Sequence, residues 1–418
     1  MIFTNTFVII YCIGFAFSFI ANLGLHTIQY RFRKKHATEI PAIFASSVTR
    51  EKLSLTNKYK NEQFFLFLFQ FIAVNVSSFL LLAFGFYSFA FYKLQNVFQN
   101  YYFHVFAFAF FASLPLSIIA LPFSLYDEFV IEKKYGFSNM TFQLWISDAL
   151  KSFVLSAILA IILLSAIIFS LQTFSLWFFI FGTIYLLFSL LVSFLYPNCI
   201  APLFNKFTPL EDGELKNKIT NLMQTSGFRA SGIFVSDASK RSAHSNAYFT
   251  GFGKTKRVVL FDTLLKQLST DELCAVIAHE LGHFKKHHII KRMIASFALV
   301  YILLFSVSKL ILVPNLYEGF FFHFQNANPA LLFVGIFLCF EIAQGFSLFV
   351  SMASNVFSRR DEYEADAYAK KICGTGEFLS SALIKLNTEN KSDLHIAKIF
   401  SFAFYSHPTV SERVEKLQ

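Results

Sequence analysis

Long uninterrupted apolar runs dominate this 418-residue chain and restrict what it can fold into. A helix needs about 20 apolar residues to cross the hydrocarbon core of a bilayer, and several runs reach that length. Apolar residues make up 55% of the chain and charged residues only 15%, whereas a soluble domain carries about a quarter charged residues. A single run of this kind would fit the buried core helix of a soluble protein, but a whole series does not. The sequence therefore predicts a polytopic membrane protein.

Seven membrane spans are expected. They cover residues 3–24, 64–91, 101–126, 149–171, 174–196, 293–313 and 330–352. The first run has no basic residues before it and is too long for a removed signal peptide, so we count it as a span. The fold class that follows is mainly α.

The connections between these spans differ in charge. Those after the first, third, fifth and seventh spans carry lysine and arginine, whereas the intervening ones contain only Lys93. Because lysine and arginine concentrate on the cytoplasmic side, the N-terminus is expected outside and the C-terminus inside. The net charge of +10 is thereby explained by topology, and no motif indicates a nucleic-acid partner.

The longest polar stretch between spans, residues 200–291, follows the fifth span. Residues 213–228 have helical spacing, while 231–237, 244–253 and 256–265 have strand character. We expect a small antiparallel β-sheet, with the GFGK sequence as a hairpin connection.

The sequence LSTDELCAVIAHELGHFKKHH comes next and contains the motif HELGH. Ser269 and Glu272 stand in the relation of a capping box, which places the histidines on a helix. His279 and His283 are one turn apart on one helix face, so both can bind one zinc ion. Glu280 lies to one side, where it can take a proton from the attacking water.

Other potential ligands in the chain are expected not to bind metal. His287 and His288 belong to the basic sequence FKKHH and are expected to face solvent or lipid headgroups. The cysteines are scattered without a CxxC pair, which speaks against a disulfide framework; they are residues 12, 199, 274, 339 and 373.

A catalytic zinc site needs a third protein ligand, and residues 358–371, SRRDEYEADAYAKK, offer one on the same side of the membrane. Glu362 and Asp366 are again one helical turn apart. Glu362 would complete a His-His-Glu set around one zinc ion per chain. Asp366 would hydrogen-bond the far nitrogen of a ligating imidazole. Alone, this segment would be an ordinary charged helix, but the HExxH motif on the same side favours the metal role.

Further segments occur through the chain in a fixed order: EFVIEKKYGF, YPNCIAPLFNKFTPLEDGEL, SNAYFTGF, KRVVLFDTLL, HELGH, SRRDEYEADAYA and YSHPTVSERVEKL. In these segments, and over essentially its whole length, the chain resembles the CAAX prenyl protease 1 family of integral-membrane zinc metalloproteases. The heat-shock membrane proteases share the HExxH and ExxxD motifs. They are less similar because they have fewer spans and lack long counterparts of residues 1–200.

The resemblance implies an architecture. Seven transmembrane helices would enclose a water-filled chamber capped by a gluzincin-type zinc domain. Membrane helices 1–5 with their loops would occupy residues 1–199, and helices 6 and 7 residues 292–352. The zinc domain would be split between residues 200–291 and 353–418.

The resemblance also implies an activity, the hydrolysis of peptide bonds near the C-terminus of a prenylated protein, in some cases with a further cut nearer its N-terminus. The strand at 246–250 would pair with an extended substrate. The matching residues are the zinc ligands His279, His283 and Glu362, the base Glu280, the substrate-stabilising Asn246 and His407, and the structural Arg413.

The chain ends SERVEKLQ, without an endoplasmic-reticulum retrieval signal, and is short for a eukaryotic member. We therefore expect a bacterial inner membrane protein, with the zinc site on the cytoplasmic side, rather than a protein of the endoplasmic reticulum membrane. Its partners would be a peptide or protein substrate, prenylated or not, and the lipid bilayer.

Two other functions stay open at this point. One is a quality-control membrane protease of the heat-shock type. The other is a seven-span transporter or receptor with a structural zinc ion, which the intramembrane polar residues Asn75, Glu341 and Gln344 would suit. Structural zinc sites usually have four protein ligands and are commonly rich in cysteine, whereas this chain offers three ligands and no cysteine pair. That difference favours the enzyme.

Overall fold

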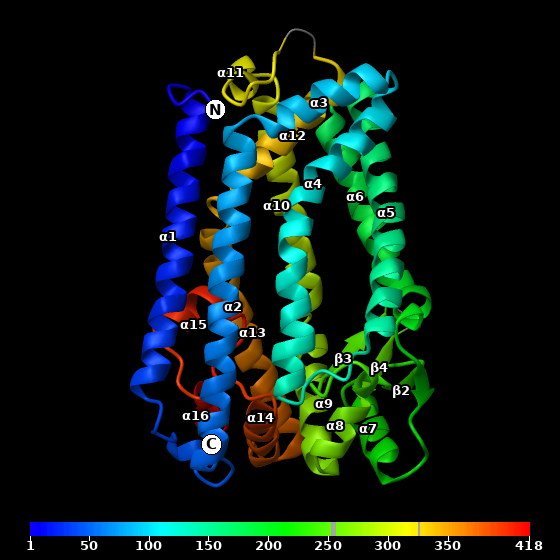
Figure 1. Cartoon of the computed structure of the whole chain (residues 1–418). Coiled ribbons are helices and arrows are strands. Elements are labelled where there is room, and N and C mark those ends of the chain that lie inside the picture. Colours follow the sequence, from blue (N-terminus) through cyan, green and yellow to red (C-terminus); the bar gives the residue numbers. More distant parts are fainter. Residues whose placement is uncertain (252–255, 325–326) are drawn as a thin grey trace.

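The computed structural model of the chain describes residues 1–251, 256–324 and 327–418. Long helices run between two ends of the molecule, with the N-terminus at one end and the C-terminus at the other (Figure 1). Within the described residues, six are long and apolar enough to cross a membrane. Only 6–17% of their most apolar stretches is buried inside the protein, as lipid-facing helices require. They are α1 (Thr6–Lys35), α2 (Arg50–Ala83), α4 (Tyr101–Tyr126), α5 (Phe142–Thr173), α6 (Trp177–Leu195) and α10 (His288–Leu310).

The expected seventh span is a bent pair of helices. α12 (Pro329–Gln344) and α13 (Ser347–Cys373) meet at an angle of 67°. If this pair is counted as one span, the described residues contain seven candidate spans. Gly345 lies at the bend, where a Cβ atom would be 2.6 Å from the backbone of Gly14 on α1. Only glycine permits so close an approach. The span predicted at 330–352 therefore corresponds to this bent pair and not to one continuous helix.

The second span also differs from its prediction at 64–91. Thr49 caps α2, and the helix continues from its polar first turns to Ala83. Gly85 then adopts a left-handed conformation (φ 73°), and the chain turns into the separate helix α3 (Phe86–Val97). The sequence stays apolar through this turn, so hydropathy alone extends the span too far.

The polar segment after α6 folds into a four-stranded sheet with the order β1-β2-β4-β3. The strands are β1 (Phe207–Pro209), β2 (Gly232–Ser236), β3 (Ala247–Thr250) and β4 (Arg257–Phe261). β1 with β2 and β3 with β4 pair antiparallel, but β2 and β4 are parallel. The predicted antiparallel sheet is therefore wrong, and the sheet is mixed. β4 lies between β3 and β2 and pairs antiparallel with β3 but parallel with β2. Most of the expected GFGK connection lies outside the described residues.

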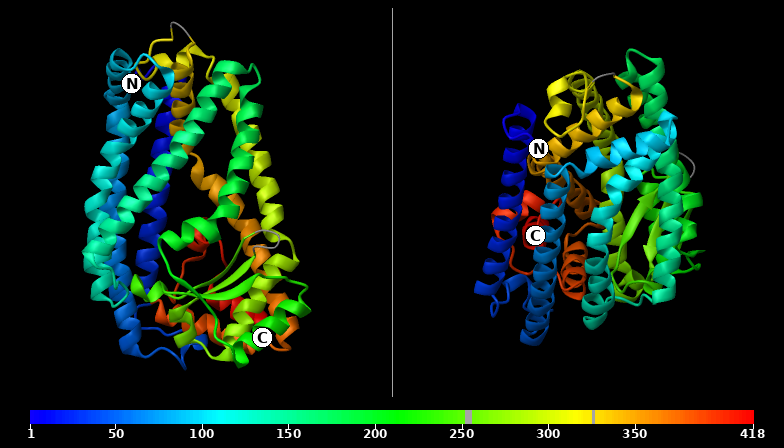
Figure 2. Two further views of the ribbon diagram at one scale, coloured as in Figure 1. Left: turned by 90° about the vertical axis from the view of Figure 1, so that its right-hand side faces the viewer. Right: turned by 45° about the horizontal axis from the view of Figure 1, so that its top comes forward.

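Shorter helices complete the end of the molecule that holds the sheet, seen from the side in Figure 2. They are α7 (Glu214–Thr225), α8 (Asp262–Gln267), α9 (Thr270–Lys285), α14 (Glu377–Glu389), α15 (Lys398–Phe404) and α16 (Val410–Leu417). α11 (Pro314–Glu318) lies at the opposite end. Single 3₁₀ or π turns occupy Ala42–Phe44, Asp127–Glu132, Tyr196–Ile200, Ala201–Leu203 and Ala238–Lys240. The four-part division of the chain into domains remains a prediction.

Helix α9 is fixed in place on two faces. Ile277 and Leu281 are buried with Val258 and Leu260 of β4. The opposite face packs through small residues against α13 and α14, so that α13 passes close by. The predicted capping box is present, because the Ser269 side chain accepts from the Glu272 backbone and the Glu272 side chain accepts from the Ser269 backbone.

Candidate metal centre

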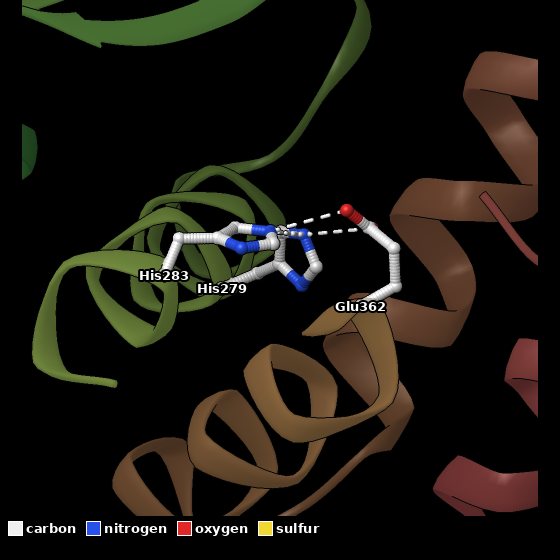
Figure 3. A group of neighbouring side chains, drawn as sticks. All are labelled: His279, His283 and Glu362. Atoms are coloured by element: carbon white, nitrogen blue, oxygen red, sulfur yellow. Dashed lines mark hydrogen bonds and ion pairs between the residues drawn. The ribbon is translucent and has the colours of Figure 1, made fainter. Parts of the chain in front are cut away.

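Three predicted ligands from two helices meet at one point (Figure 3). His279 and His283 come from α9 and Glu362 from α13. The two Nε2 atoms are 3.2 Å apart, Nε2 of His283 is 3.2 Å from Oε1 of Glu362, and Nε2 of His279 is 3.4 Å from Oε2. One ligand atom from each residue thus forms a small triangle, with all three atoms within 4.8 Å of one another. Glu362 is almost fully buried.

The triangle fits a zinc ion. Tetrahedral geometry with ligands at about 2.0–2.1 Å puts the ligand atoms about 3.3 Å from one another. Within the described part of the chain, Oε2 of Glu362 is buried without a hydrogen-bond partner. The guanidinium of Arg413 is 3.7 Å away, beyond hydrogen-bond distance, so a metal ion would satisfy a buried oxygen that is otherwise costly. With three protein ligands the site would also keep the open position that a catalytic zinc needs.

Gly282 explains why the two helices come close enough to share these ligands. A Cβ atom at Gly282 would lie 2.8 Å from Cα and 3.0 Å from the carbonyl oxygen of Ala365 on α13. Both are backbone atoms that cannot move aside without moving the helix. The sequence LGH therefore sets the α9–α13 distance, and with it the size of the ligand triangle.

Replacing Gly282 by alanine is expected to push α9 and α13 apart and to weaken zinc binding by roughly 10–100-fold, since overpacking typically costs about 1–3 kcal/mol. Competition with a zinc chelator measures the affinity. Gly24→Ala is the matched control, because nothing lies within 4 Å of the position of its Cβ atom. Equal affinities for the two variants would show that the helix contact does not set the site.

A carboxylate and an arginine lie behind His279. Its Nδ1 donates to Oδ1 of Asp366 over 2.8 Å, and this bond keeps a proton on Nδ1 and directs Nε2 at the triangle. Arg413 donates to both oxygens of Asp366, from Nε over 2.9 Å and from Nη2 over 2.6 Å. Burial lowers the pKa of His279, but the hydrogen bond to Asp366 and the nearby carboxylate of Glu362 outweigh it and raise the pKa to about 9. A metal ion would replace the proton that His279 otherwise holds at neutral pH.

His288 contradicts its predicted place in solvent or among lipid headgroups. Its side chain is 1% exposed and lies 3.0 Å from His283, Nδ1 to Nδ1. Acidic residues of α13 compensate the burial, since Nε2 of His288 is 3.2 Å from Oε2 of Glu364. The sequence FKKHH alone indicates an exposed basic segment. The burial of His288 could not be predicted from it, because the acidic partners of His288 are distant in the chain.

Glu280 follows the first ligand and lines the same cavity, which has a volume of about 390 Å³. Burial raises the pKa of its carboxyl group, while the two neighbouring histidines lower it less. A carboxylate with a raised pKa beside a metal centre is suited to accept a proton and pass it on.

Asn246 and His407 line the cavity as well. Asn246 directly precedes β3, and its carbonyl oxygen accepts from the backbone N–H of Phe261, which ties it to β4. Nε2 of His407 is 3.4 Å from Oε1 of Glu362. Thr409 caps α16, so His407 lies before this helix and is not part of its cap. Seven of the eight predicted site residues thus line one cavity, and Asp366 lies behind it.

Comparison with known proteins places this geometry among membrane peptidases. The sequence model of peptidase family M48 matches residues 209–418, and that of the CAAX prenyl protease N-terminal region, with five membrane helices, matches residues 29–206. CAAX prenyl protease 1 of Saccharomyces cerevisiae is 40% identical over 303 residues, which cover 69% of this chain and 66% of the yeast protein.

Related proteins from a plant and an animal match similarly. The CAAX prenyl protease 1 homologues of Arabidopsis thaliana and Homo sapiens are 39% and 35% identical, over 69% of this chain and 67% and 68% of their own length. The matched region thus spans about two thirds of these relatives. The crystal structure of S. mikatae Ste24p superimposes with a TM-score of 0.90 at 30% identity, covering 98% of this chain and 99% of that chain.

Proposed function

Because the chain belongs to peptidase family M48, as a membrane zinc metalloprotease of the CAAX prenyl protease type, we propose that it hydrolyses peptide bonds near the C-terminus of a prenylated protein or peptide. The observation that carries the proposal is the triangle of His279, His283 and Glu362, with Glu280 lining the same cavity. When bound there, zinc would polarise the peptide carbonyl and activate water.

The side chains around the triangle have separate roles in this proposal. Glu280 accepts the proton of the attacking water and returns it to the leaving amine. Asn246 and His407 donate hydrogen bonds to the carbonyl oxygen as negative charge develops on it. Asp366, held by two hydrogen bonds from Arg413, keeps His279 in the tautomer that binds metal.

Strand β3 supports the binding of an extended substrate. It lies at the end of the strand order β1-β2-β4-β3, so its outer edge has no strand partner within the described sheet. Ala247 at its start lines the cavity beside Asn246. A substrate added to this edge would gain main-chain hydrogen bonds and pass along the metal centre. Leucines at 379, 383 and 386 of α14 give the cavity an apolar wall for substrate side chains.

The position of Glu362 suits a lipid-modified substrate. The first turns of α13 expose Phe349, Val350 and Phe357, which are 53%, 56% and 69% exposed. Glu362 follows Phe357 by five residues, or about 7.5 Å along the helix. Glu362 is buried and lies about 140° around the helix from the exposed Phe357. A peptide joined to a prenyl chain on these apolar turns would therefore reach the metal centre by passing around α13.

The proposed orientation follows from charge. The metal centre lies at the same end of the molecule as the C-terminus (Figure 1) and as the connections rich in lysine and arginine. The positive-inside rule makes this end cytoplasmic. The same orientation holds in a bacterial inner membrane, our proposed location, and in the endoplasmic reticulum, the alternative.

Asn246→Ala and His407→Ala are each expected to keep bound zinc and to lower kcat by about 10²–10³, the usual loss when one donor to a developing oxyanion is removed. Single-turnover cleavage with zinc measured on the same sample separates catalysis from metal loss. The exposed Asn221 on α7 and His323 at the opposite end supply matched controls. Wild-type cleavage by either site variant would leave that residue with a structural role only.

The substrate class is tested with the full-length chain reconstituted in lipid vesicles. We expect a peptide ending in a prenylated cysteine motif to be cleaved faster than the same peptide without the prenyl group. Chelation should stop the reaction and one equivalent of zinc should restore it. Zinc-dependent cleavage with no preference for the prenyl group would instead favour a general quality-control protease.

A further inference from the structure

Among the described residues, His288 is the one buried histidine that lies beside the triangle and that the proposed reaction does not use. Its Nδ1 lies 3.0 Å from Nδ1 of His283, and its Nε2 lies 3.2 Å from Oε2 of Glu364. These contacts form a continuous line from a carboxylate on α13, through the first residue of α10, to the second predicted ligand on α9.

The order of protons along this line is determined by the metal site. Nε2 of His283 points into the triangle, so its lone pair must be free and the proton must be on Nδ1. That N–H can donate only to an unprotonated Nδ1 of His288, which leaves the proton of His288 on Nε2. There it donates to Glu364. We propose that His288 and Glu364 form a positioning pair that fixes the tautomer and orientation of His283, an inference that rests on the zinc site proposed above.

The two histidine ligands are then each oriented by a hydrogen-bonded carboxylate, one directly and one through a second imidazole. His279 donates directly to a carboxylate, that of Asp366. His283 reaches its carboxylate through a second imidazole. In each case a carboxylate at the end of the hydrogen-bond chain raises the basicity of the metal-binding nitrogen, as partners of ligating histidines generally do.

The backbone conformation between α9 and α10 places His288 beside His283. His287 adopts a left-handed conformation with φ 58°, which is uncommon for a residue other than glycine, although histidine is enriched among the exceptions. This single residue turns the chain after α9 and starts α10 with His288 beside His283. The preceding residues KK continue the turn without burial, which explains why only the second histidine of the pair enters the site.

The carboxylates that face His288 are themselves held. Arg360 donates from Nε to Oε1 of Glu364 over 3.3 Å. Asp361 lies 3.6 Å from Nε2 of His288 and accepts from Nε of Arg292 over 2.7 Å. Because Arg292 is on the membrane helix α10, this network joins a membrane span to the orientation of a zinc ligand.

The test is zinc affinity, measured by chelator competition on the purified full-length chain, with the visible spectrum of the Co²⁺-substituted protein as a second readout. His288→Ala should weaken zinc binding by about 10–100-fold, as the loss of such a partner usually does. His288→Asn keeps an acceptor near the Nδ1 position and should restore most of the affinity. His288→Gln has the right polarity but no acceptor at that position, so it should resemble alanine. Glu364→Ala changes a partly exposed residue and should show an intermediate loss.

His287→Asn is the matched control, since asparagine tolerates the left-handed turn and the side chain is outside the line. Zinc affinities of the His288 and Glu364 variants equal to that of the wild type would overturn the inference while leaving the zinc site intact. Equal losses for asparagine and alanine at 288 would also overturn it, because they would indicate packing rather than an acceptor. A wild-type chain that binds no zinc would refute the proposed function itself.

Discussion

Glu362→Ala is expected to leave the purified chain with almost no zinc. The triangle has three protein ligands, so no spare donor can replace the lost carboxylate. His407 lies 3.4 Å from Oε1 of Glu362, but its side chain is 62% exposed, and its Nδ1 is hydrogen-bonded to the hydroxyl of the neighbouring Ser406 rather than to a buried carboxylate. Elemental analysis of the protein after removal of loosely bound metal measures the effect. Glu415→Ala, an exposed glutamate on α16, is the control and should retain one zinc per chain.

Substitutions at Glu362 and Asp366, both on α13, should reduce zinc binding to different extents. Asp366→Ala removes the acceptor of His279 but no ligand, so we expect zinc to bind about 10–100-fold more weakly rather than to be lost. Arg413 would then face Glu362 without its own carboxylate partner. Normal zinc content in Glu362→Ala would mean that the third ligand lies elsewhere. Complete zinc loss in Asp366→Ala would mean that Asp366 does more than accept a hydrogen bond from His279.

Glu280→Gln is expected to retain zinc and lose peptide cleavage. The substitution keeps the size of the side chain but removes its ability to accept a proton, and loss of a general base typically lowers the rate by about 10²–10⁴. Glu280 lies in the cavity wall and outside the ligand triangle, so the metal should be unaffected. Single-turnover cleavage and zinc content, measured on one sample, provide the test. A variant that cleaves at the wild-type rate would exclude Glu280 as the base.

Much of this site could be predicted because its geometry is local in the sequence. The HELGH motif on a capped helix fixes the relative position of His279 and His283, and the same spacing rule relates Glu362 to Asp366. That the two helices meet could be inferred only from the need for a third ligand. The contact itself depends on Gly282 fitting against Ala365, a relation that spacing within one helix cannot show.

The prediction for His288 is wrong because the environment of this residue is formed by segments distant in the sequence. Its buried state depends on a left-handed residue at 287 and on carboxylates that are about seventy positions away in the sequence. Hydropathy and charge describe FKKHH as a basic segment at the membrane edge, which is true of the lysines. A signal was nevertheless present, since a metal-binding histidine almost always donates its other ring N–H to a partner, and His288 follows His283 by only five residues.

The errors in the fold have the same origin. Hydropathy predicted the membrane helices but extended the second span beyond Gly85. The helix ends before Gly85 because this residue adopts a left-handed conformation, although the sequence stays apolar. The bend between α12 and α13 depends on Gly345 packing against Gly14, two residues far apart in the chain. β2, β3 and β4 lie within the segments predicted from composition, whereas the three-residue strand β1 was not predicted. The parallel pairing of β2 with β4 could not be predicted either, because alternation within a strand does not encode the direction of its neighbour.

X-ray absorption at the zinc K-edge of the purified full-length protein tests the central claim most directly. The structure predicts one zinc per chain with nitrogen and oxygen neighbours at about 2.0–2.2 Å and the outer scattering of two imidazole rings. Glu362→Ala should abolish this signal, and chelation should abolish cleavage together with it. A shell of sulfur neighbours at about 2.3 Å, or the same zinc spectrum in a chain lacking both His279 and His283, would contradict the site described here.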